Sequence, residues 1–216
     1  MLTVLPSSPE QRLQQIAQAR QAVLRDGRSQ PGLLAESWIE RSWQRCLASG
    51  KKPEQEVGFD VLSAQALRRT EEANHVLVQA ARPVLEKLGA AIASTRYFAI
   101  LTNAQGVVVD VNGAIDRRDR RADLITRIGV DLSEQSVGTT AIGAALTELQ
   151  PVWLHRGEHF FNANSAYSCA GAPLFGPDGR CAGMLDLTGV DTVERPELKH
   201  LVVQSARSIE NALIQS

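Results

Sequence analysis

The chain has 216 residues, of which 44% are hydrophobic and 22% are charged, a balance typical of a globular protein and not of a disordered one. This length is ample to bury a core, and it fits one domain with a helical extension or two small domains. Because 23 basic residues stand against 24 acidic ones, the net charge of -1 gives no global field that would draw the chain to nucleic acid or to a membrane.

Cysteine use and the first residues favour a cytoplasmic protein. Cys46, Cys169 and Cys181 are far apart and odd in number, which disfavours a disulfide framework. The N-terminus has no basic start followed by an apolar run, so it is not typical of a secretory signal. No uninterrupted apolar stretch approaches the ~20 residues that a membrane-spanning helix requires. We therefore expect a cytosolic protein without membrane contact.

Two helices are predicted in the N-terminal part. Ser8 is placed to cap a helix that starts at Pro9 and ends at residues 26–27. A second helix is expected to follow residues 31–32 and to end at Gly50, with an apolar stripe of Leu33, Leu34, Trp38, Ile39, Trp43 and Leu47. The two tryptophans are most simply a packing face, although an exposed pair would make a partner-binding surface. A polar linker follows.

A long helix and a hairpin are predicted next. Ser63 is placed to cap a helix over residues 64–94, and Pro83 inside it is expected to kink it or to divide it into two. From Arg96 the pattern becomes strand-like, with strands predicted at 97–101 and 107–111 and a turn at 103–106. Residues 115–128 are expected to form a surface segment that leads into a short helix.

The C-terminal half predicts a small-residue helix, further strands and a closing helix. The helix covers residues 139–149, and a strand follows at 151–155. Residues 171–175 and 181–187 predict a second hairpin, and a helix over 195–214 closes the chain. This order does not alternate strand and helix as a doubly wound sheet would. We expect an α/β (α+β) fold with an antiparallel sheet flanked by helices.

Seven short phrases occur in order along the chain. They are RSWQRC at 41–46, DLSE at 131–134, VGTTAI at 137–142, HRGEHF at 155–160, CAGAP at 169–173, LDLTG at 185–189 and SARSIEN at 205–211. Together they resemble the N-terminal sensor region of sigma-54-dependent transcriptional activators of the acetoin-catabolism and dihydroxyacetone-kinase-operon type. The resemblance implies a GAF (PAS-like) sensor domain, which we place at residues 63–216, preceded by an N-terminal helical region at residues 1–62.

The resemblance also implies an ATPase domain and a DNA-binding helix-turn-helix beyond the sensor. The sequence contains no GxxxxGK[ST] phosphate loop, so we expect either an excised sensor or a stand-alone relative. Direct nucleic-acid binding by this chain is not expected, because acidic residues interrupt its arginine cluster. That cluster is Asp116, Arg117, Arg118, Asp119, Arg120, Arg121 and Asp123.

Aromatic and hydrogen-bonding residues gather between residues 139 and 169. Small-molecule pockets are mostly apolar with few polar anchors, which is the composition of this region. The candidate ligand-binding residues are Thr139, Thr140, Trp153, His155, His159, Phe160, Phe161, Asn162, Tyr167 and Cys169. For each of them the alternative is packing in the core, because buried aromatic side chains usually serve packing.

Two other uses of this region remain open. His155, His159 and Cys169 are residue types that bind zinc or iron, so one alternative is a metal site for redox or gas sensing. No CxxC or helical HExxH spacing supports such a site, and Gly157 separates the two histidines. Cys169 with a histidine and Asp186 could also be drawn as a thiol enzyme, but the spacing does not demand it and no GxSxG loop is present. We expect no enzyme, cofactor or metal.

The expected function is that of a sensor domain for a small polar metabolite, for which the resemblance implies a hydroxyketone or a diol. Closure of residues 138–145 over the ligand would supply the contacts that shift a two-state equilibrium. The helices at 64–94 and 195–214 would carry the signal outward, through a homodimer. Their apolar stripes either form the dimer seam or pack on the sheet; these residues are Leu77, Val84, Leu88, Leu201, Ile209 and Leu213.

Overall fold

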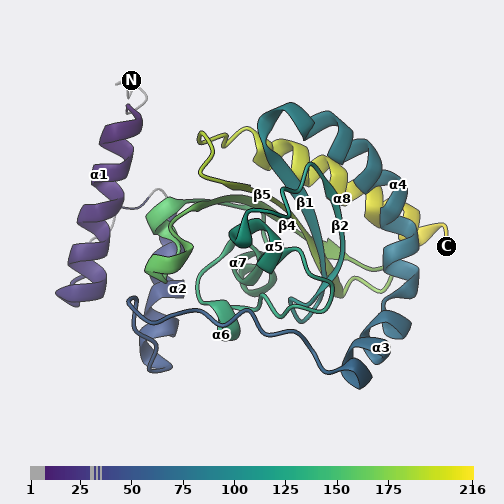
Figure 1. Cartoon of the computed structure of the whole chain (residues 1–216), viewed down its shortest axis with the longest axis horizontal. Coiled ribbons are helices and arrows are strands. Elements are labelled where there is room, and N and C mark those ends of the chain that lie inside the picture. The colour runs from purple at the N-terminus through teal and green to yellow at the C-terminus, as the bar shows by residue number, and fades with distance from the viewer. Residues whose placement is uncertain (1–7, 30–31, 33, 35) are drawn as a thin grey trace.

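A five-stranded antiparallel sheet, in the order β2-β1-β5-β4-β3, forms the centre of the molecule (Figure 1). The computed structural model describes residues 8–29, 32, 34 and 36–216. The strands are β1 Tyr97–Asn103, β2 Val108–Gly113, β3 Val152–His155, β4 Tyr167–Phe175 and β5 Cys181–Val190. The expected antiparallel sheet with flanking helices is confirmed.

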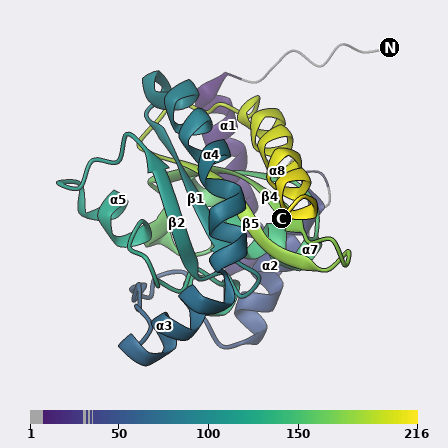
Figure 2. The ribbon, with the colours of Figure 1, turned by 90° about the vertical axis from the view of Figure 1, so that its right-hand side faces the viewer.

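One face of the sheet is covered by the two longest helices, α4 His75–Ile92 and α8 Leu198–Ile214 (Figure 2). Because side chains alternate along a strand, every second residue of β1 points to this layer. The residues that share its core include Leu77, Leu88, Tyr97, Ala99, Leu101, Trp153, Leu185, Leu187, Ile209 and Leu213. Both apolar stripes therefore pack on the sheet of their own chain, which is the second of the two expected roles.

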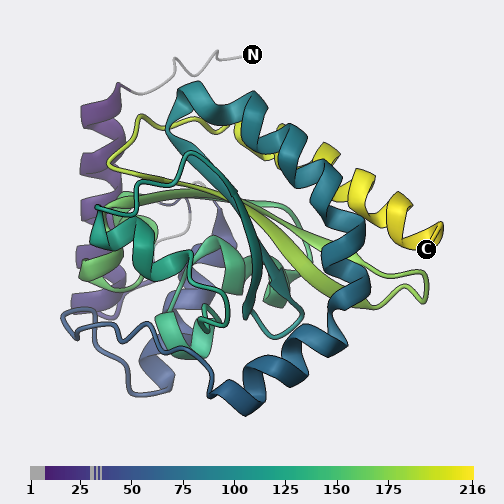
Figure 3. The same cartoon turned by 45° about the vertical axis from the view of Figure 1, so that its right-hand side comes forward.

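Three short helices cover the opposite face, as Figure 3 shows. They are α5 Arg120–Ile125, α6 Glu134–Val137 and α7 Ala141–Glu148. The small residues of α7 let it lie directly on β4. At Gly171 an added Cβ would come within 2.8 Å of Met184 Cε and 3.1 Å of the Ala141 carbonyl oxygen, so only glycine permits this approach. Part of the small-residue signal thus reflects close packing.

The N-terminal helices α1 Pro9–Arg20 and α2 Ser37–Ala48 lie on the same side as α7. A capping box between Ser8 and Gln11 starts α1 as predicted, and a π-helical turn at Gln21–Arg25 ends it. Trp38 and Trp43 are almost fully buried, so they are a packing face. Helix α2 begins later than predicted. Leu34 lies in a bend before it, and Leu33 lies outside the described residues.

The predicted helix over 64–94 is divided, but not at the predicted proline. Its two parts are α3 Ala64–Ala73 and α4, and the break is at Asn74, whose Nδ2 donates to the Thr70 carbonyl oxygen at 2.7 Å. An asparagine side chain that satisfies a terminal carbonyl competes with continuation of the helix. Pro83 instead lies inside α4 on its exposed side. Proline has no N–H to donate to the Gln79 carbonyl oxygen, but that exposed position is open to water.

The remaining elements agree with their predictions apart from boundaries and short turns. The strands of the second hairpin are longer than predicted, and α8 begins at Leu198 instead of residue 195. The four-residue helix α6 and the 3₁₀ turns Arg156–Glu158 and Asn162–Asn164 were not predicted. Within the described ranges, none of the helices has the length and apolar character needed to cross a membrane.

Candidate functional site

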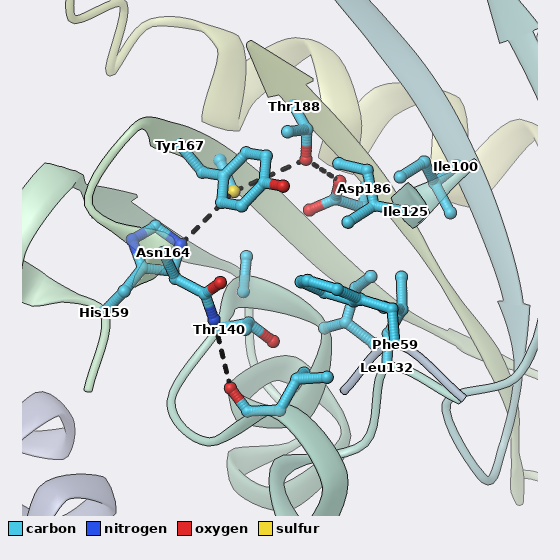
Figure 4. Close-up of a pocket in the computed structure, with 14 residues that line it drawn as sticks. Phe59, Ile100, Ile125, Leu132, Thr140, His159, Asn164, Tyr167, Asp186 and Thr188 are labelled. Atoms are coloured by element: carbon cyan, nitrogen blue, oxygen red, sulfur yellow. Dashed lines mark hydrogen bonds between the residues drawn. The ribbon is translucent and has the colours of Figure 1, made fainter. Parts of the chain in front are cut away.

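A cavity lies between the sheet and the layer of α5, α6 and α7 (Figure 4). Its empty space, opening included, is about 350 Å³. Apolar side chains form most of its wall: Phe59, Ile100, Ile125, Leu132, Val137, Ala141, Ile142 and the ring of Tyr167. The remaining lining residues are Thr140, His159, Asn164, Cys169, Asp186 and Thr188. A cavity of this size and character suits a ligand of few heavy atoms.

Two central strands supply the floor of the cavity. Cys169 of β4 is paired with Thr188 of the neighbouring strand β5. On the other side of β5, Asp186 is paired with Ile100 of β1. Because alternate residues of a strand share a face, these side chains all point away from α4 and α8.

Asp186 is a buried acid in the floor of this cavity. Its side chain is 1% exposed. Oδ2 accepts a hydrogen bond from the Thr188 hydroxyl, whereas Oδ1 has no partner among the described residues. Burial disfavours the charged form and raises the pKa of Asp186 to about 7. The protonated, neutral form of this residue is therefore favoured to a higher pH than in an exposed carboxyl group.

Asn164 and Thr140 bring further polar atoms to the cavity. Asn164 Nδ2 donates to the Val137 carbonyl oxygen at 3.2 Å, while Oδ1 finds no partner in the described part of the chain. Thr140 Oγ1 caps α7 by accepting from the Gly143 N–H at 3.2 Å, so its hydroxyl hydrogen remains available. Figure 4 shows the Asn164 and Asp186 side chains directed into the same space.

His159 and Cys169 form a neutral pair at the edge of the cavity. His159 Nδ1 lies 2.9 Å from the Arg156 carbonyl oxygen, so it carries the proton, and Nε2 faces Cys169 Sγ at 3.6 Å. Burial lowers the pKa of His159 to about 4 and raises the pKa of the Cys169 thiol well above its usual value. A thiolate nucleophile is disfavoured here, which argues against the thiol-enzyme alternative.

Trp153 and His155 point to the other face of the sheet. Trp153 Nε1 donates to Glu194 Oε1 at 3.0 Å, and its ring packs in the core under α4 and α8. His155 Nδ1 lies 2.7 Å from Ser168 Oγ. His155 therefore does not converge with His159 and Cys169. Across residues 8–29, 32, 34 and 36–216, no group of three or more His, Cys, Asp and Glu side chains is placed to hold a metal ion.

The other sequence-predicted residues support the cavity from outside its lining. Phe160 and Phe161 pack in the core, and the Phe161 ring fills the place where a side chain at Gly138 would lie. Asn162 Oδ1 accepts from Arg20, and Thr139 Oγ1 lies 2.7 Å from Ser42 Oγ. Of the ten candidates the structure brings Thr140, His159, Tyr167 and Cys169 to the cavity.

Several lining residues are absent from the ligand-binding candidates, including the polar residues Asp186 and Thr188. Strand alternation was an available signal for these two, because they follow Met184 at a spacing of two on β5. No sequence signal places Phe59 in the wall, since it belongs to the segment treated as a polar linker.

Side chains of both N-terminal helices donate hydrogen bonds to the segment that carries His159 and Asn164. The Arg20 guanidinium donates to the carbonyl oxygens of Gly157, His159 and Phe160 at 2.8, 2.6 and 3.0 Å. From α2, Trp43 Nε1 donates to the Glu158 carbonyl oxygen at 2.8 Å. The wall of the cavity is therefore fixed from outside by α1 and α2.

Arg12 of α1 adds an ion pair to the buried carboxylate of Glu158, with 2.7 Å between Nη2 and Oε1. Burial outweighs this pairing and raises the pKa of Glu158 to about 7. The pair holds α1 against the turn at Arg156–Glu158.

The family described as the MimR N-terminal domain matches residues 13–211. The chain belongs to this family. It is 32% identical over 181 residues to the acetoin catabolism regulatory protein of Cupriavidus necator, a match that covers 81% of this chain and 27% of that protein. It is 30% identical over 197 residues to the propane 2-monooxygenase operon transcriptional activator MimR of Mycolicibacterium goodii, covering 90% and 32% respectively.

A solved structure has the same fold. The E. coli DhaR(N)-DhaL complex contains a chain that superposes with a TM-score of 0.78 at 19% identity, covering 83% of this chain and 61% of that one. This likeness supports the expected GAF-type fold, and the curated matches confirm the resemblance to acetoin-catabolism regulators. The family and these relatives are transcriptional regulators and not enzymes, as predicted. The chain spans about 27% to 32% of the length of these curated relatives.

Proposed function

We propose that the chain is the ligand-sensing N-terminal part of a cytoplasmic, sigma-54-dependent transcriptional activator, and that it binds a small polar metabolite in the cavity on the sheet. One observation carries the proposal: the cavity combines an apolar wall with a few polar atoms, two of which have no partner among the described residues. The curated relatives include a regulator of acetoin catabolism. A hydroxyketone or a diol is therefore the proposed ligand class.

The proposed signal path runs through α4 and α8 to the rest of the activator. Because these helices pack on each other and on strands that line the cavity, a ligand that favours one arrangement of the sheet would bias their positions. We also propose a homodimer through these terminal helices. Their inner stripes are buried against the sheet, so the dimer would use their outward faces.

A thermal-shift screen of the purified chain tests ligand binding. The screen covers small hydroxyketones, diols, amino alcohols and divalent metals, with and without a chelator. A ligand that binds only the folded state raises the melting temperature, so we expect an organic stabiliser that is insensitive to chelator. Stabilisation by metals alone would favour the metal-sensor alternative over the metabolite.

A matched pair of variants localises the site. Cys169→Met places a longer side chain at the cavity, whereas Cys181→Met makes the same change in a half-buried thiol away from its lining. We expect Cys169→Met to abolish the ligand-dependent shift and Cys181→Met to keep it. Equal shifts in both variants would place the ligand outside this cavity.

A further inference from the structure

Two buried oxygen atoms in the cavity have no hydrogen-bond partner among the described residues, namely Asp186 Oδ1 and Asn164 Oδ1. Their side chains are 1% and 2% exposed. Buried polar atoms of folded proteins are nearly always paired, and an unpaired one destabilises the structure. Both residues line the cavity and point into it (Figure 4). Their missing partners are therefore expected from a bound molecule.

Every element around Asp186 presents uncharged groups to it. The apolar side chains of Ile100 on β1, Ile125 on α5 and Phe59 face the cavity, and α7 contributes Thr140, Ala141 and Ile142. The titratable groups in the lining are Tyr167 and Cys169 of β4 and His159 of the adjoining segment. Burial raises the pKa of the phenol and of the thiol and lowers the pKa of the imidazole, so all three are neutral near pH 7. An ionised Asp186 would be an isolated buried charge.

The hydrogen bonds that Asp186 and Asn164 make within the protein determine whether each can donate to a ligand or accept from it. Thr188 Oγ1 lies within hydrogen-bond distance of both Asp186 Oδ2 and Cys169 Sγ, but its hydroxyl has a single proton. We assign this proton to Asp186 Oδ2, because thiol sulfur is the weaker acceptor, and a proton on the carboxyl group then lies at Oδ1, which faces the cavity. Asn164 uses its amide nitrogen on the Val137 carbonyl oxygen and presents its own carbonyl oxygen. Besides the hydroxyl hydrogen of Thr140, the cavity thus offers a donor at Asp186 and an acceptor at Asn164.

We propose that Asp186 acts as a neutral carboxylic acid and that, with Asn164, it selects an uncharged ligand carrying an acceptor oxygen at one end and a hydroxyl donor at the other. This assignment rests on the proposed function, because it names the contacts of the same cavity. Asp186 donates to the ligand's acceptor oxygen, and Asn164 accepts from its hydroxyl group. An anion finds no cationic side chain in the lining, and an ammonium group requires Asp186 to ionise.

The protonation state is tested without any ligand, by infrared spectroscopy. We expect the carbonyl-stretch band of a buried protonated carboxyl group at about pH 6, its loss above about pH 8, and its absence from Asp186→Asn, since the pKa of Asp186 is about 7. Glu158 has a similarly raised pKa but lies outside the cavity lining. The Glu158→Gln variant is therefore the control, and it keeps the Asp186 band. If Asp186→Asn does not fold, titration of the band in Glu158→Gln decides the question. Failure to see the band at pH 6 overturns the proposal.

Selection is tested by calorimetric titration with three probes of similar size: hydroxyacetone, lactate and 1-amino-2-propanol. We expect hydroxyacetone to bind at least tenfold more tightly than the other two at pH 6. Its affinity falls about tenfold for each pH unit above about 7, because only the protonated acid donates. A preference for the amino alcohol that grows with pH would instead make Asp186 an ionised counter-ion and overturn the proposal. An intact infrared band with no binding by any probe would overturn the selection and count against the proposed ligand class, while Asp186 would remain assigned as neutral.

Discussion

At the scale of single residues, the cavity depends on side chains that burial keeps neutral. His159 illustrates this, because its Nδ1 donates to a backbone carbonyl and its Nε2 faces a thiol that is also uncharged. A buried neutral histidine must be protonated when the protein unfolds in acid. The stability of the domain is therefore linked to pH through this residue.

We predict that His159→Gln reduces the acid sensitivity of the fold. The pKa of His159 is about 4 in the folded chain and about 6.5 when unfolded. The pKa of His159 is lower in the folded chain than in the unfolded chain. Its contribution to the free energy of unfolding is therefore complete above pH 6.5 and is lost as pH falls towards 4, by about 1.4 kcal/mol per pH unit. Between pH 7 and pH 5 the wild type should lose about 2 kcal/mol more than the variant. Urea unfolding at both values measures this difference.

The matched control is His200→Gln, which makes the same substitution at an exposed position of α8. It should leave the pH dependence of the wild type unchanged. If His159→Gln and the wild type lose equal stability on acidification, His159 is not held neutral by its surroundings.

Strand geometry explains which site residues the sequence could locate. Tyr167 and Cys169 both reach the cavity because they share one face of β4, and their role in ligand binding stays a prediction. Trp153 and His155 also share a face of β3, but it is the opposite one, and composition alone cannot tell the two faces apart. Phe59 reaches the wall by tertiary packing of an irregular segment, for which no periodic signal exists.

At the scale of elements, polar contacts to short turns hold the N-terminal helices against the rest of the fold. Ser42 Oγ and Arg45 Nε of α2 both bond to the carboxylate of Glu134, each at 2.7 Å. On α1, the Arg20 guanidinium donates to three carbonyl oxygens in residues 157–160, and its Cζ lies 5.7 Å from the Trp43 ring centroid. The phrase RSWQRC and the phrases DLSE and HRGEHF are thus in contact. The division into residues 1–62 and 63–216 stays a prediction.

We predict that Arg20→Gln loosens the segment that carries His159. The variant removes a charged donor from several carbonyl groups, and hydrogen bonds to charged groups contribute about 1.5–3 kcal/mol. We expect a loss of about 2 kcal/mol in the free energy of unfolding. Amide hydrogen exchange should become faster in residues 9–20 and 157–164, while β1 and β5 keep their protection.

Arg25→Gln is the control, because it removes the same charge from an exposed side chain one turn further along. It should change neither exchange nor stability. Unaltered exchange at residues 157–164 in Arg20→Gln would show that α1 does not fix this wall of the cavity.

Helix breaks show the limit of sequence reasoning at this scale. The elements themselves were predictable from periodicity, including the long helix before β1. The sequence predicts a kink or a division at Pro83, yet the chain breaks at Asn74, where a side-chain hydrogen bond to the Thr70 carbonyl competes with the helix. A proline on the exposed face of a helix removes a backbone hydrogen bond that water can replace. Pro83 therefore does not end the helix, although proline is a strong helix breaker. The four-residue helix α6 is too short to show a period.

At the scale of the whole molecule, the sheet separates the cavity from the helices proposed to carry the signal. The cavity lies on the face of α7, and α4 and α8 pack on the other face. The strands between them can therefore carry the effect of a ligand to α4 and α8. β5 is the direct link, because Asp186 points into the cavity while Leu185 and Leu187 point to the helix layer.

A substitution at Ile209 distinguishes internal packing of α4 and α8 from a dimer seam. Ile209 is fully buried within the core shared by α4, α8 and the sheet. Ile209→Ala creates a cavity there and should lower the free energy of unfolding by about 2–5 kcal/mol, without changing the mass of the native species in light scattering. Ile214→Ala, at an exposed position of the same helix, should leave stability nearly unchanged. If Ile209→Ala instead lowers the native mass while unfolding is unaffected, the stripe lies between subunits and the packing assigned to it is wrong.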